Sequence, residues 1–249
     1  MKIIITGASS GIGESMAEIF RNQGHQVIAV GRDKNRLDKL KDRIQCETIQ
    51  LDISTLENCQ ELFAQVPDAD VLVNNAGFGY IGDFEECPLS KELDMIDINI
   101  KAMHILTKLY LPGMEQRKKG YILNVASIAG FLPGPEMATY YATKSYVVRF
   151  TQGLAEEMRQ RKTGVYIGAL CPGPVATRFN ETAGCDFKAR SMSSSRVAEL
   201  AIQKMWKKKE IIVVGISAKV VRLGAKICSD RLMGRMVSKM QFKKKNKKH

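Results

Sequence analysis

The strongest constraint on the fold is the regular alternation of short apolar runs with longer amphipathic stretches. The runs are rich in Ile, Val and Leu and lack a polar face, which is typical of strands buried between two layers. The stretches between them carry apolar residues at helical spacing, such as Met16, Ile19 and Phe20. The seven runs are KIIIT at 2–6, QVIAV at 26–30, ETIQLDI at 47–53, DVLVN at 70–74, GYILNVAS at 120–127, GVYIGALC at 164–171 and EIIVVG at 210–215.

Seven strands that alternate with helices predict an α/β, doubly wound Rossmann fold. We expect a seven-stranded parallel sheet with helices on both faces. The chain shows no internal repeat, and no linker before about residue 216. We therefore predict one catalytic domain at 1–216 and a basic C-terminal helical extension at 217–249.

The formal net charge of +12 belongs mostly to the extension, where 11 Lys/Arg and one acidic residue give +10. Two segments in it, 219–228 and 230–240, place basic and apolar residues on opposite helical faces. Such helices could lie on an anionic membrane surface, or their apolar faces could cover the substrate cleft or a neighbouring subunit. Nucleic-acid binding through this segment would be non-specific and salt-sensitive, and we do not expect it.

The six cysteines are scattered, with no CxxC pair and no cluster of histidines. This pattern argues against a disulfide framework and against a metal site, and it favours a reducing compartment. The sequence has neither a signal peptide nor an apolar run of about 18 residues. We expect a cytoplasmic protein, with peripheral membrane contact as an alternative.

A glycine-rich turn, TGASSGIG at 6–13, follows the first predicted strand and begins a helix. Gly7 permits the tight turn, Gly11 lets the backbone approach a phosphate, and Gly13 allows the helix to pack closely on the strand. The unpaired amides at the helix N-terminus would then bind a pyrophosphate. The expected contact residues are Gly7, Ser9, Ser10, Gly11, Ile12 and Gly13.

A second turn, NNAG at 74–77, ends the fourth predicted strand. Ligands of doubly wound sheets bind at the carboxyl ends of the strands, so this turn should lie on the same rim as the first. The small side chains would let a cofactor ribose pass close to the backbone at Asn75, Ala76 and Gly77. An ordinary surface turn is the alternative.

In YYATK, at 140–144, a phenol and an ammonium group are four residues apart and so share one helical face. Lowering a tyrosine pKa from about 10 to about 7 needs roughly 4 kcal/mol. An ammonium group about 4–5 Å away, at an effective dielectric of about 20, supplies on the order of 3.5–4 kcal/mol. Lys144 would thus make Tyr140 a usable general acid or base, unless the two form only an exposed surface pair. Tyr141 does not have this spacing.

Together with these motifs, Asn99 in DINI, Ser127 in NVASIAG and the segment CPGPVATRF at 171–179 give the chain a family resemblance. Over residues 1 to about 215 it resembles the short-chain dehydrogenase/reductase superfamily. The resemblance implies that Asn99, Ser127, Tyr140 and Lys144 form a catalytic tetrad. In it, Ser127 stabilises the oxyanion, Lys144 also binds ribose hydroxyls, and Asn99 holds a water of the proton relay. It also implies a homodimer or homotetramer.

The choice of nicotinamide cofactor depends on the end of the second predicted strand. An acidic residue there favours NAD, and an arginine accommodates the 2′-phosphate of NADP. Gly31 stands where the NAD enzymes of the family carry the acid, and Arg32 follows. We therefore predict NADP, although a shifted turn could bring Asp33 to the ribose and favour NAD. By resemblance, the remaining contacts are Asp52 and Ile53 at the adenine, and Pro172, Gly173, Val175 and Thr177 along the nicotinamide.

The predicted activity is NADP(H)-dependent interconversion of a ketone or aldehyde and an alcohol, with an apolar substrate. The alternatives are an NAD-dependent alcohol dehydrogenase and a catalytically idle NADP-binding scaffold that acts through its basic tail. By resemblance, residues 178–194 form the substrate lid. Candidate pocket residues are Phe78, Tyr80, Leu132 and Met137, for each of which simple packing is the alternative role.

Overall fold

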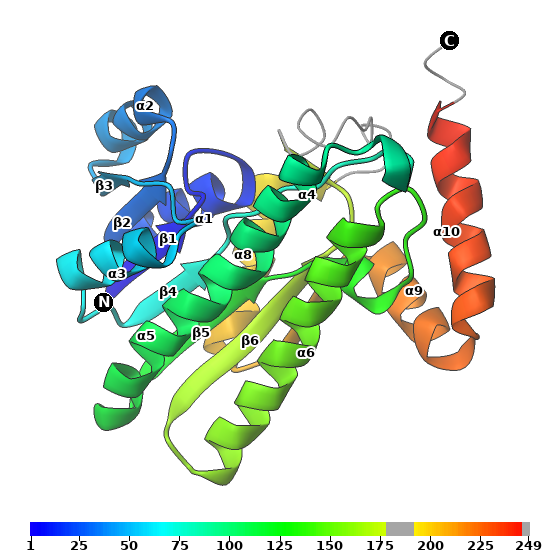
Figure 1. The fold of residues 1–249 in the computed structure, drawn as a ribbon. Helices are drawn as coiled ribbons and strands as arrows, with labels where there is room; N and C mark the ends of the chain where they lie inside the picture. The colour runs from blue at the N-terminus through cyan, green and yellow to red at the C-terminus, as the bar shows by residue number, and fades with distance from the viewer. Residues whose placement is uncertain (178–191, 246–249) are drawn as a thin grey trace.

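The computed structural model describes residues 1–177 and 192–245 of the chain. Seven parallel strands form one sheet, and helices cover both of its faces (Figure 1). The doubly wound Rossmann prediction is therefore confirmed. The strands are β1 (Lys2–Thr6), β2 (Gln26–Gly31), β3 (Glu47–Gln50), β4 (Val71–Asn74), β5 (Gly120–Val125), β6 (Val165–Pro172) and β9 (Ile211–Val214), with the short pair β7 (Val175–Ala176) and β8 (Met192–Ser193) apart from the sheet.

The helices alternate with the strands along the chain, as the apolar spacing predicts. Short helical turns, η1 and η3, precede α4 and α6, and a π-helical turn, η2, joins α4 to α5. The helices are α1 (Gly11–Asn22), α2 (Lys34–Ile44), α3 (Leu56–Gln65), η1 (Phe84–Glu86), α4 (Leu89–Ile96), η2 (Asp97–Ala102), α5 (Met103–Gln116), η3 (Ile128–Phe131), α6 (Ala138–Gln160), α8 (Ser194–Trp206), α9 (Ile216–Ile227) and α10 (Asp230–Lys245).

The strand order is β3-β2-β1-β4-β5-β6-β9, so the chain reverses direction across the sheet between β1 and β4. These two strands pair directly, with Ile4 opposite Leu72. In a doubly wound sheet, the crevice for a ligand lies outside the carboxyl ends of the strands at such a reversal. The turns that follow β1 and β4 are the two glycine-containing turns of the sequence, so both reach this rim.

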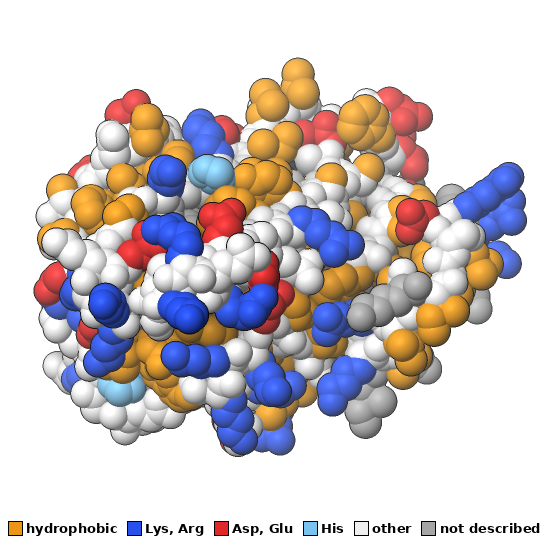
Figure 2. Space-filling model, turned by 90° about the horizontal axis from the view of Figure 1, so that it is seen from below, with side chains coloured by type: hydrophobic (Ala, Val, Ile, Leu, Met, Phe, Trp, Pro, Cys, Tyr) orange, Lys and Arg blue, Asp and Glu red, His pale blue; other side chains and the backbone are white. Residues whose placement is uncertain are grey.

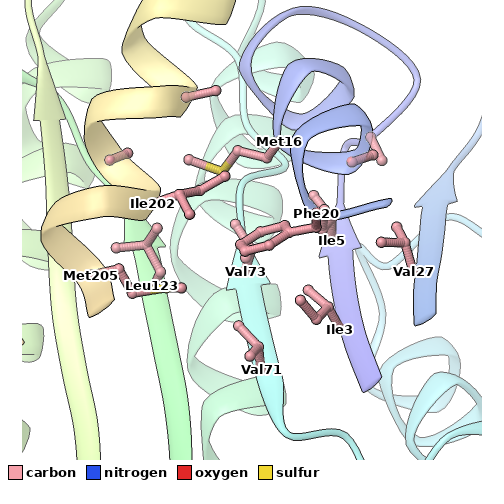
Figure 3. Packing of buried hydrophobic residues seen from close by; sticks show 14 of the residues in the cluster. Ile3, Ile5, Met16, Phe20, Val27, Val71, Val73, Leu123, Ile202 and Met205 are labelled. Carbon is pink, nitrogen blue, oxygen red and sulfur yellow. The ribbon is translucent and has the colours of Figure 1, made fainter. Parts of the chain in front are cut away.

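Side chains that alternate along each strand form two hydrophobic cores, one on each face of the sheet. Ile3 and Ile5 point toward α1 and α8, where Met16, Phe20 and Ile202 close the core (Figure 3). On the opposite face α3, α5 and α6 pack over the alternate strand residues, such as Ile4, Leu72 and Ile122. All three isoleucines of β1 are fully buried. This two-sided burial explains why the strands read as continuous apolar runs.

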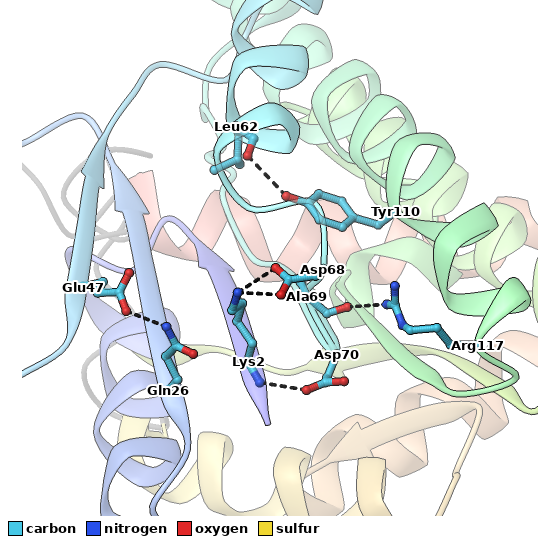
Figure 4. Close-up of polar contacts among 9 residues, drawn as sticks. All are labelled: Lys2, Gln26, Glu47, Leu62, Asp68, Ala69, Asp70, Tyr110 and Arg117. Carbon is cyan, nitrogen blue, oxygen red and sulfur yellow. Dashed lines mark hydrogen bonds and ion pairs between the residues drawn. The ribbon is translucent and has the colours of Figure 1, made fainter.

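Polar contacts hold together the amino-terminal ends of the strands, at the opposite end of the sheet from the crevice (Figure 4). The Lys2 ammonium group pairs with Asp68 at 2.6 Å, and the Lys2 backbone N–H donates to Asp70 at 2.9 Å. Arg117, just after α5, donates to the Ala69 carbonyl at 2.9 Å. These contacts fix the start of β4 and leave the opposite rim to carry the functional residues.

Buried amides hold the middle of the sheet at its carboxyl end. The side-chain nitrogen of Asn74 donates to Thr107 at 3.1 Å and to Asn124 at 2.9 Å, and Asn124 donates to Thr151 at 2.9 Å. This ladder ties β4 and β5 to α5 and α6. A buried polar network of this kind fixes the register of the elements it joins.

The C-terminal extension forms two helices, as predicted, and only part of its apolar surface packs on the domain. Met233 and Val237 of α10 are buried against Leu132. The apolar residues of α9 that the sequence places on one face, Val220 and Ile227 among them, are instead exposed. Among the described residues, no helix is long and apolar enough to cross a membrane.

The structure changes one predicted boundary and leaves most of one predicted segment undescribed. The third strand ends at Gln50 rather than at 53, because the chain turns there and Asp52 accepts a hydrogen bond from the Ser54 N–H at 3.1 Å. Most of the expected substrate lid, at 178–191, lies outside the described residues.

Candidate active site

The two glycine-containing turns are locked together at the carboxyl ends of β1 and β4. The hydroxyl of Thr6 accepts hydrogen bonds from the N–H groups of Asn75 and Ala76, both at 3.0 Å. The Asn75 amide in turn donates to the carbonyls of Thr6 and Gly7, at 2.9 and 3.1 Å. The sequence analysis assigned no role to Thr6. Its position, as the last residue of β1 and the first of the glycine-rich motif, could have indicated one.

The first turn has the geometry of a phosphate site at a helix N-terminus. Gly11, the first residue of α1, has a backbone φ of +61°, which residues other than glycine rarely adopt. Ser10 is the N-cap, and its side chain makes no capping hydrogen bond. A Cβ on Gly13 would lie 2.4 Å from the Asn75 side-chain nitrogen, so only glycine fits between the two turns. The first turn of α1, whose leading N–H groups have no partner within the helix, therefore lies beside the turn after β4.

Asn99 is placed by the π-helical turn η2 between α4 and α5. Such turns are rare and often occur at functional sites. The side chain is buried, and both amide hydrogens are used: one bonds the Phe78 carbonyl at 2.9 Å and the other the Thr143 hydroxyl at 3.0 Å. Its oxygen accepts from the Phe78 N–H at 3.1 Å. Asn99 thus fastens the turn after β4 to α6.

Lys144 lies on α6 with its ammonium group buried at the end of β5. It donates to the Val125 carbonyl at 2.9 Å, and the residue is only 5% exposed. Burial lowers the pKa of Lys144 to about 8, so the ammonium form still dominates at pH 7. A Cβ on Gly77 would lie 3.3 Å from this nitrogen and 2.7 Å from the Asn99 oxygen. Lys144, Asn99 and the second turn therefore meet at one point.

Tyr140 is one helical turn before Lys144, and its ring centroid lies 5.9 Å from the ammonium nitrogen. The positive charge on this side of the ring favours the phenolate form of the tyrosine over the phenol. The tyrosine is 8% exposed, and it lies in a cluster with Met95 and Met137. The alternative of an exposed surface pair is therefore wrong.

Ser127 caps η3, directly after β5. Its hydroxyl oxygen accepts a hydrogen bond from the Ala129 N–H at 3.1 Å, which leaves the hydroxyl proton available as a donor. The turn packs tightly on α6, since a Cβ on Gly130 would lie 2.6 Å from the Lys144 carbonyl oxygen. This packing brings the start of η3 to the helix that carries Tyr140 and Lys144.

Thr143 is a site residue that the sequence reading missed. Its hydroxyl accepts from Asn99 and donates to the Tyr140 carbonyl at 2.7 Å, so it joins two of the four expected tetrad residues. A threonine three residues after the tyrosine can make this backbone contact in any helix. The spacing was therefore visible, but the partner from η2 was not.

At the other end of the crevice, Arg32 follows β2 and is exposed. It forms a long ion pair with Asp52 at 3.4 Å. Asp33 caps α2 by accepting from the Arg36 N–H at 3.2 Å, and its carboxylate pairs with the Arg36 side chain at 2.7 Å. Ile53 is buried behind Asp52.

The segment after β6 reaches the first glycine turn. A Cβ on Gly11 would lie 2.9 Å from a methyl carbon of Thr177, so these two loops are in contact. Pro172 ends β6, Gly173 follows it, and Val175 begins the short strand β7. The expected nicotinamide segment is thus next to the expected pyrophosphate loop.

A pocket opens beside Tyr140, between the loop after β4 and the start of α6. Tyr80 and Met137, two of the four candidates, line it, whereas Phe78 packs behind it and Leu132 packs under α10. The described part of the chain holds no cluster of three potential metal ligands. The full lining is Tyr80, Gly82, Phe84, Cys87, Glu92, Met95, Glu136, Met137, Ala138, Thr139 and Tyr140.

A model of the short chain dehydrogenase family matches residues 1–186 of this chain. The chain belongs to the short-chain dehydrogenase family. Membership bears out the resemblance drawn from the motifs, and it makes the protein an NAD(P)-dependent oxidoreductase that acts on CH–OH groups.

Relatives within the short-chain dehydrogenases cover most of the chain. An uncharacterized oxidoreductase of Staphylococcus saprophyticus is 34% identical over 229 residues, which are 88% of this chain and 96% of that protein. An NADP-dependent 3-hydroxy acid dehydrogenase of Salmonella typhimurium is 37% identical over 188 residues, which are 72% of this chain and 75% of that protein.

Solved short-chain dehydrogenases share the fold. One from Sphingobium yanoikuyae, in complex with NADPH, has a TM-score of 0.81 and 28% identity, and the match covers 90% of this chain and 92% of that one. Another, from Burkholderia phymatum in complex with NAD, has a TM-score of 0.82 at 23% identity over 90% of this chain and 92% of that one. The second likeness concerns the fold alone.

Proposed function

We propose that the protein interconverts a ketone or aldehyde and the corresponding alcohol with NADP(H), and that Tyr140 is the general acid and base. The observation that carries this proposal is the buried Lys144 ammonium group, which lies 5.9 Å from the Tyr140 ring and in contact range of the turn after β4. Burying a charged group costs free energy, and such groups are concentrated at functional sites. Here it favours the phenolate and so lets the tyrosine exchange a proton near pH 7.

The other tetrad residues have roles that follow from their contacts. Ser127 keeps its hydroxyl proton and would donate it to the substrate oxygen as negative charge develops there. Asn99 has no amide hydrogen left, so a water of the proton relay would bind its oxygen or its backbone carbonyl. Thr143 is a positioning residue that fixes Asn99 relative to Tyr140.

The crevice residues fit a nicotinamide dinucleotide. The α1 amides and the glycine at position 11 suit a pyrophosphate, and position 77 is so close to Lys144 that a side chain there would displace it. Lys144 would bind the ribose hydroxyls between these two points. When bound, the cofactor supplies or accepts the hydride.

The residues after β2 support NADP over NAD. Asp33 is engaged as the cap of α2 and as the partner of Arg36, so it is not placed to bind a ribose hydroxyl. Arg32 is exposed, and its pair with Asp52 is long enough to be exchanged for a phosphate. The NADPH-bound structure from Sphingobium yanoikuyae and the NADP-dependent relative from Salmonella agree with this choice.

The pocket supports a largely apolar substrate. Phe84, Met95 and Met137 supply its apolar wall beside Tyr140, and Tyr80 adds a ring. Such a wall would hold the carbon skeleton while the carbonyl oxygen meets the tyrosine and serine hydroxyls.

The protein is expected in the cytoplasm as a homodimer or homotetramer. The five described cysteines are free thiols, which suits a reducing compartment. The proposal of self-association comes from family resemblance, and sedimentation equilibrium of the purified chain would test it.

The exposed stripe of the extension favours a second contact, with an anionic membrane surface. This stripe, formed by Val220, Leu223, Ile227, Leu232 and Met236, has side chains that are 47–76% exposed. Lys219, Arg231, Arg235 and Lys239 on the same two helices are also exposed. The two helices form the right-hand end of the molecule in Figure 1, and apolar and basic side chains lie side by side at that end in Figure 2. A second copy of the chain would bring like charges together, whereas anionic lipid would neutralise them.

The test is the Tyr140→Phe variant with NADPH and a panel of ketones and aldehydes. Loss of the phenol should lower kcat by at least about a hundredfold, because general acid catalysis contributes that much or more. Binding of NADPH, followed by its fluorescence, should persist. Turnover at the parent rate would refute the role of Tyr140 and with it the proposed chemistry.

A further inference from the structure

Glu136 is the one pocket residue whose charged group has no partner within the described chain. It lies two residues before the start of α6, and both of its carboxylate oxygens are buried without a hydrogen bond. It lines the same pocket as Tyr140, four residues further along the chain. Its backbone is held in place, since the Gly82 N–H donates to the Glu136 carbonyl at 2.9 Å.

Two features make this residue costly for the fold. A carboxylate shielded from water destabilises the protein unless donors surround it. Glu136 also has φ +61°, a left-handed conformation that is strained for a side chain other than glycine. Strain and an unpaired charge at a pocket wall are typical of a binding residue rather than of a packing residue.

Glu92 is a useful contrast in the same pocket. Its carboxylate accepts a hydrogen bond from the Thr139 hydroxyl at 2.6 Å, so it is paired by the protein itself. Glu92 thereby ties α4 to the start of α6. Glu136 has no such task, and its acceptor capacity remains for a ligand.

The lining of the pocket decides the sign of the complementary group. Its described residues include two glutamates and no lysine, arginine or histidine. Lys91 is not one of the lining residues, and its ammonium nitrogen lies 5.0 Å from the centre of the Tyr80 ring. An ionised carboxylate accepts hydrogen bonds and donates none, so the matching ligand group is a donor, best of all a cation.

We propose that Glu136 selects substrates whose end remote from the carbonyl carries an ammonium group, and that it disfavours substrates with a carboxylate there. This inference rests on the proposed function, because it uses Tyr140 to define where the carbonyl lies. It sets the chain apart from its relative named as a 3-hydroxy acid dehydrogenase, whose substrates are acids by name.

Three acetophenones of similar size provide the test: 4-(aminomethyl)acetophenone, 4-ethylacetophenone and 4-acetylbenzoate. Their kcat/KM values with NADPH are compared in the wild type and in Glu136→Gln, which keeps the length and removes the charge. In the wild type the amine should exceed the ethyl compound by about tenfold or more, as a charge-assisted hydrogen bond implies. In Glu136→Gln this ratio should fall to within about threefold. Glu86→Gln, which removes an exposed charge on η1, should leave the ratio as in the wild type.

A binding readout covers the case in which none of the three ketones is reduced. The melting temperature of the NADPH-loaded protein should rise with the amine more than with the benzoate, and Glu136→Gln should abolish the difference. An equal response to all three compounds, or the same preference in wild type and Glu136→Gln, would overturn the selectivity. Failure of the proposed function would appear differently, as preserved turnover in Tyr140→Phe.

Discussion

A lysine buried beside a tyrosine is an electrostatic device with a cost that can be measured. The ammonium group of Lys144 has one hydrogen-bond partner among the described residues, the Val125 carbonyl, and burial lowers its pKa from 10.5 to about 8. A pKa lowered this far corresponds to roughly 3 kcal/mol of destabilisation of the charged form in the folded state. The charged form of Lys144 thus lowers the free energy of unfolding.

The Lys144→Met variant should therefore be more stable and less active. Below pH 8 both folded and unfolded chains hold the proton, and the folded chain bears the full desolvation cost. Methionine removes that cost but leaves a carbonyl unpaired, so the gain at pH 7 should be about 1–2 kcal/mol. Denaturant unfolding of the cofactor-free protein measures it, and kcat should fall by about a hundredfold or more.

The pH dependence gives this prediction its control. Between pH 8 and pH 10.5 the unfolded chain binds more protons than the folded chain, so the stability contributed by Lys144 rises with pH across that window. The advantage of Lys144→Met should shrink accordingly, vanish at about pH 9 and reverse by pH 10.5, because the wild type regains roughly 3 kcal/mol over the whole window. A constant difference from pH 7 to pH 10.5 would mean that packing, not charge, explains the effect.

Residue roles were predictable where one local motif carries them, and not where distant segments meet. The spacing of Tyr140 and Lys144 predicts a shared helical face. The pairing of Thr143 with Asn99 joins α6 to η2, 44 residues apart, and no local pattern indicates it. Glu136 was missed for the same reason, because the lack of a hydrogen-bond donor at its buried carboxylate is a property of the tertiary structure.

At the scale of elements, the junction of β2 and α2 determines the expected cofactor preference. A helix needs a cap, and Asp33 provides one here, which fixes where α2 begins. The capping bond keeps Asp33 at the helix end, and the Arg32 side chain before it is exposed. Under the proposed preference for NADP, secondary structure thus selects Arg32 rather than Asp33 as the residue that meets the ribose.

The Arg32→Ala variant should lose its preference for NADPH. Its KM for NADPH should rise about tenfold to a hundredfold, as expected for the loss of an arginine–phosphate contact, while the KM for NADH changes little. Lys41→Ala, which removes an exposed charge at the far end of α2, is the matched control. In the wild type, equal thermal protection by NADPH and NADH would contradict the assignment.

Elements buried on both faces were the easiest to predict, and irregular ones the hardest. The strand at Lys2–Thr6 agrees with the sequence reading residue for residue, because two cores enforce its apolar run. The π-helical turn at 97–102 has no signal in composition, since it depends on the fit of Asn99 between α6 and the turn after β4. The tertiary contacts of one side chain decide the backbone there.

For the whole molecule, the separation of charge predicted from the sequence is found as two exposed helices at one end. One side of each helix packs on the domain, through Ala218 and Val221 on α9 and through Met233 and Val237 on α10. The amphipathic pattern predicted the helices, but it could not tell which apolar residues would be covered. The three on α9 are exposed, so the surface that they form with the basic residues is available for a partner.

Vesicle binding tests the proposed partner of this surface. The purified protein should co-sediment with vesicles that contain anionic phosphatidylserine and not with pure phosphatidylcholine, and binding should weaken as salt rises. A variant with Val220, Leu223 and Ile227 all changed to Gln should lose this binding, because it removes most of the exposed apolar area of α9. Leu89→Gln, at an exposed leucine of α4, should retain it. If the triple variant instead turns an oligomer into a monomer, and the wild type ignores anionic vesicles, the stripe is a contact between copies of the chain.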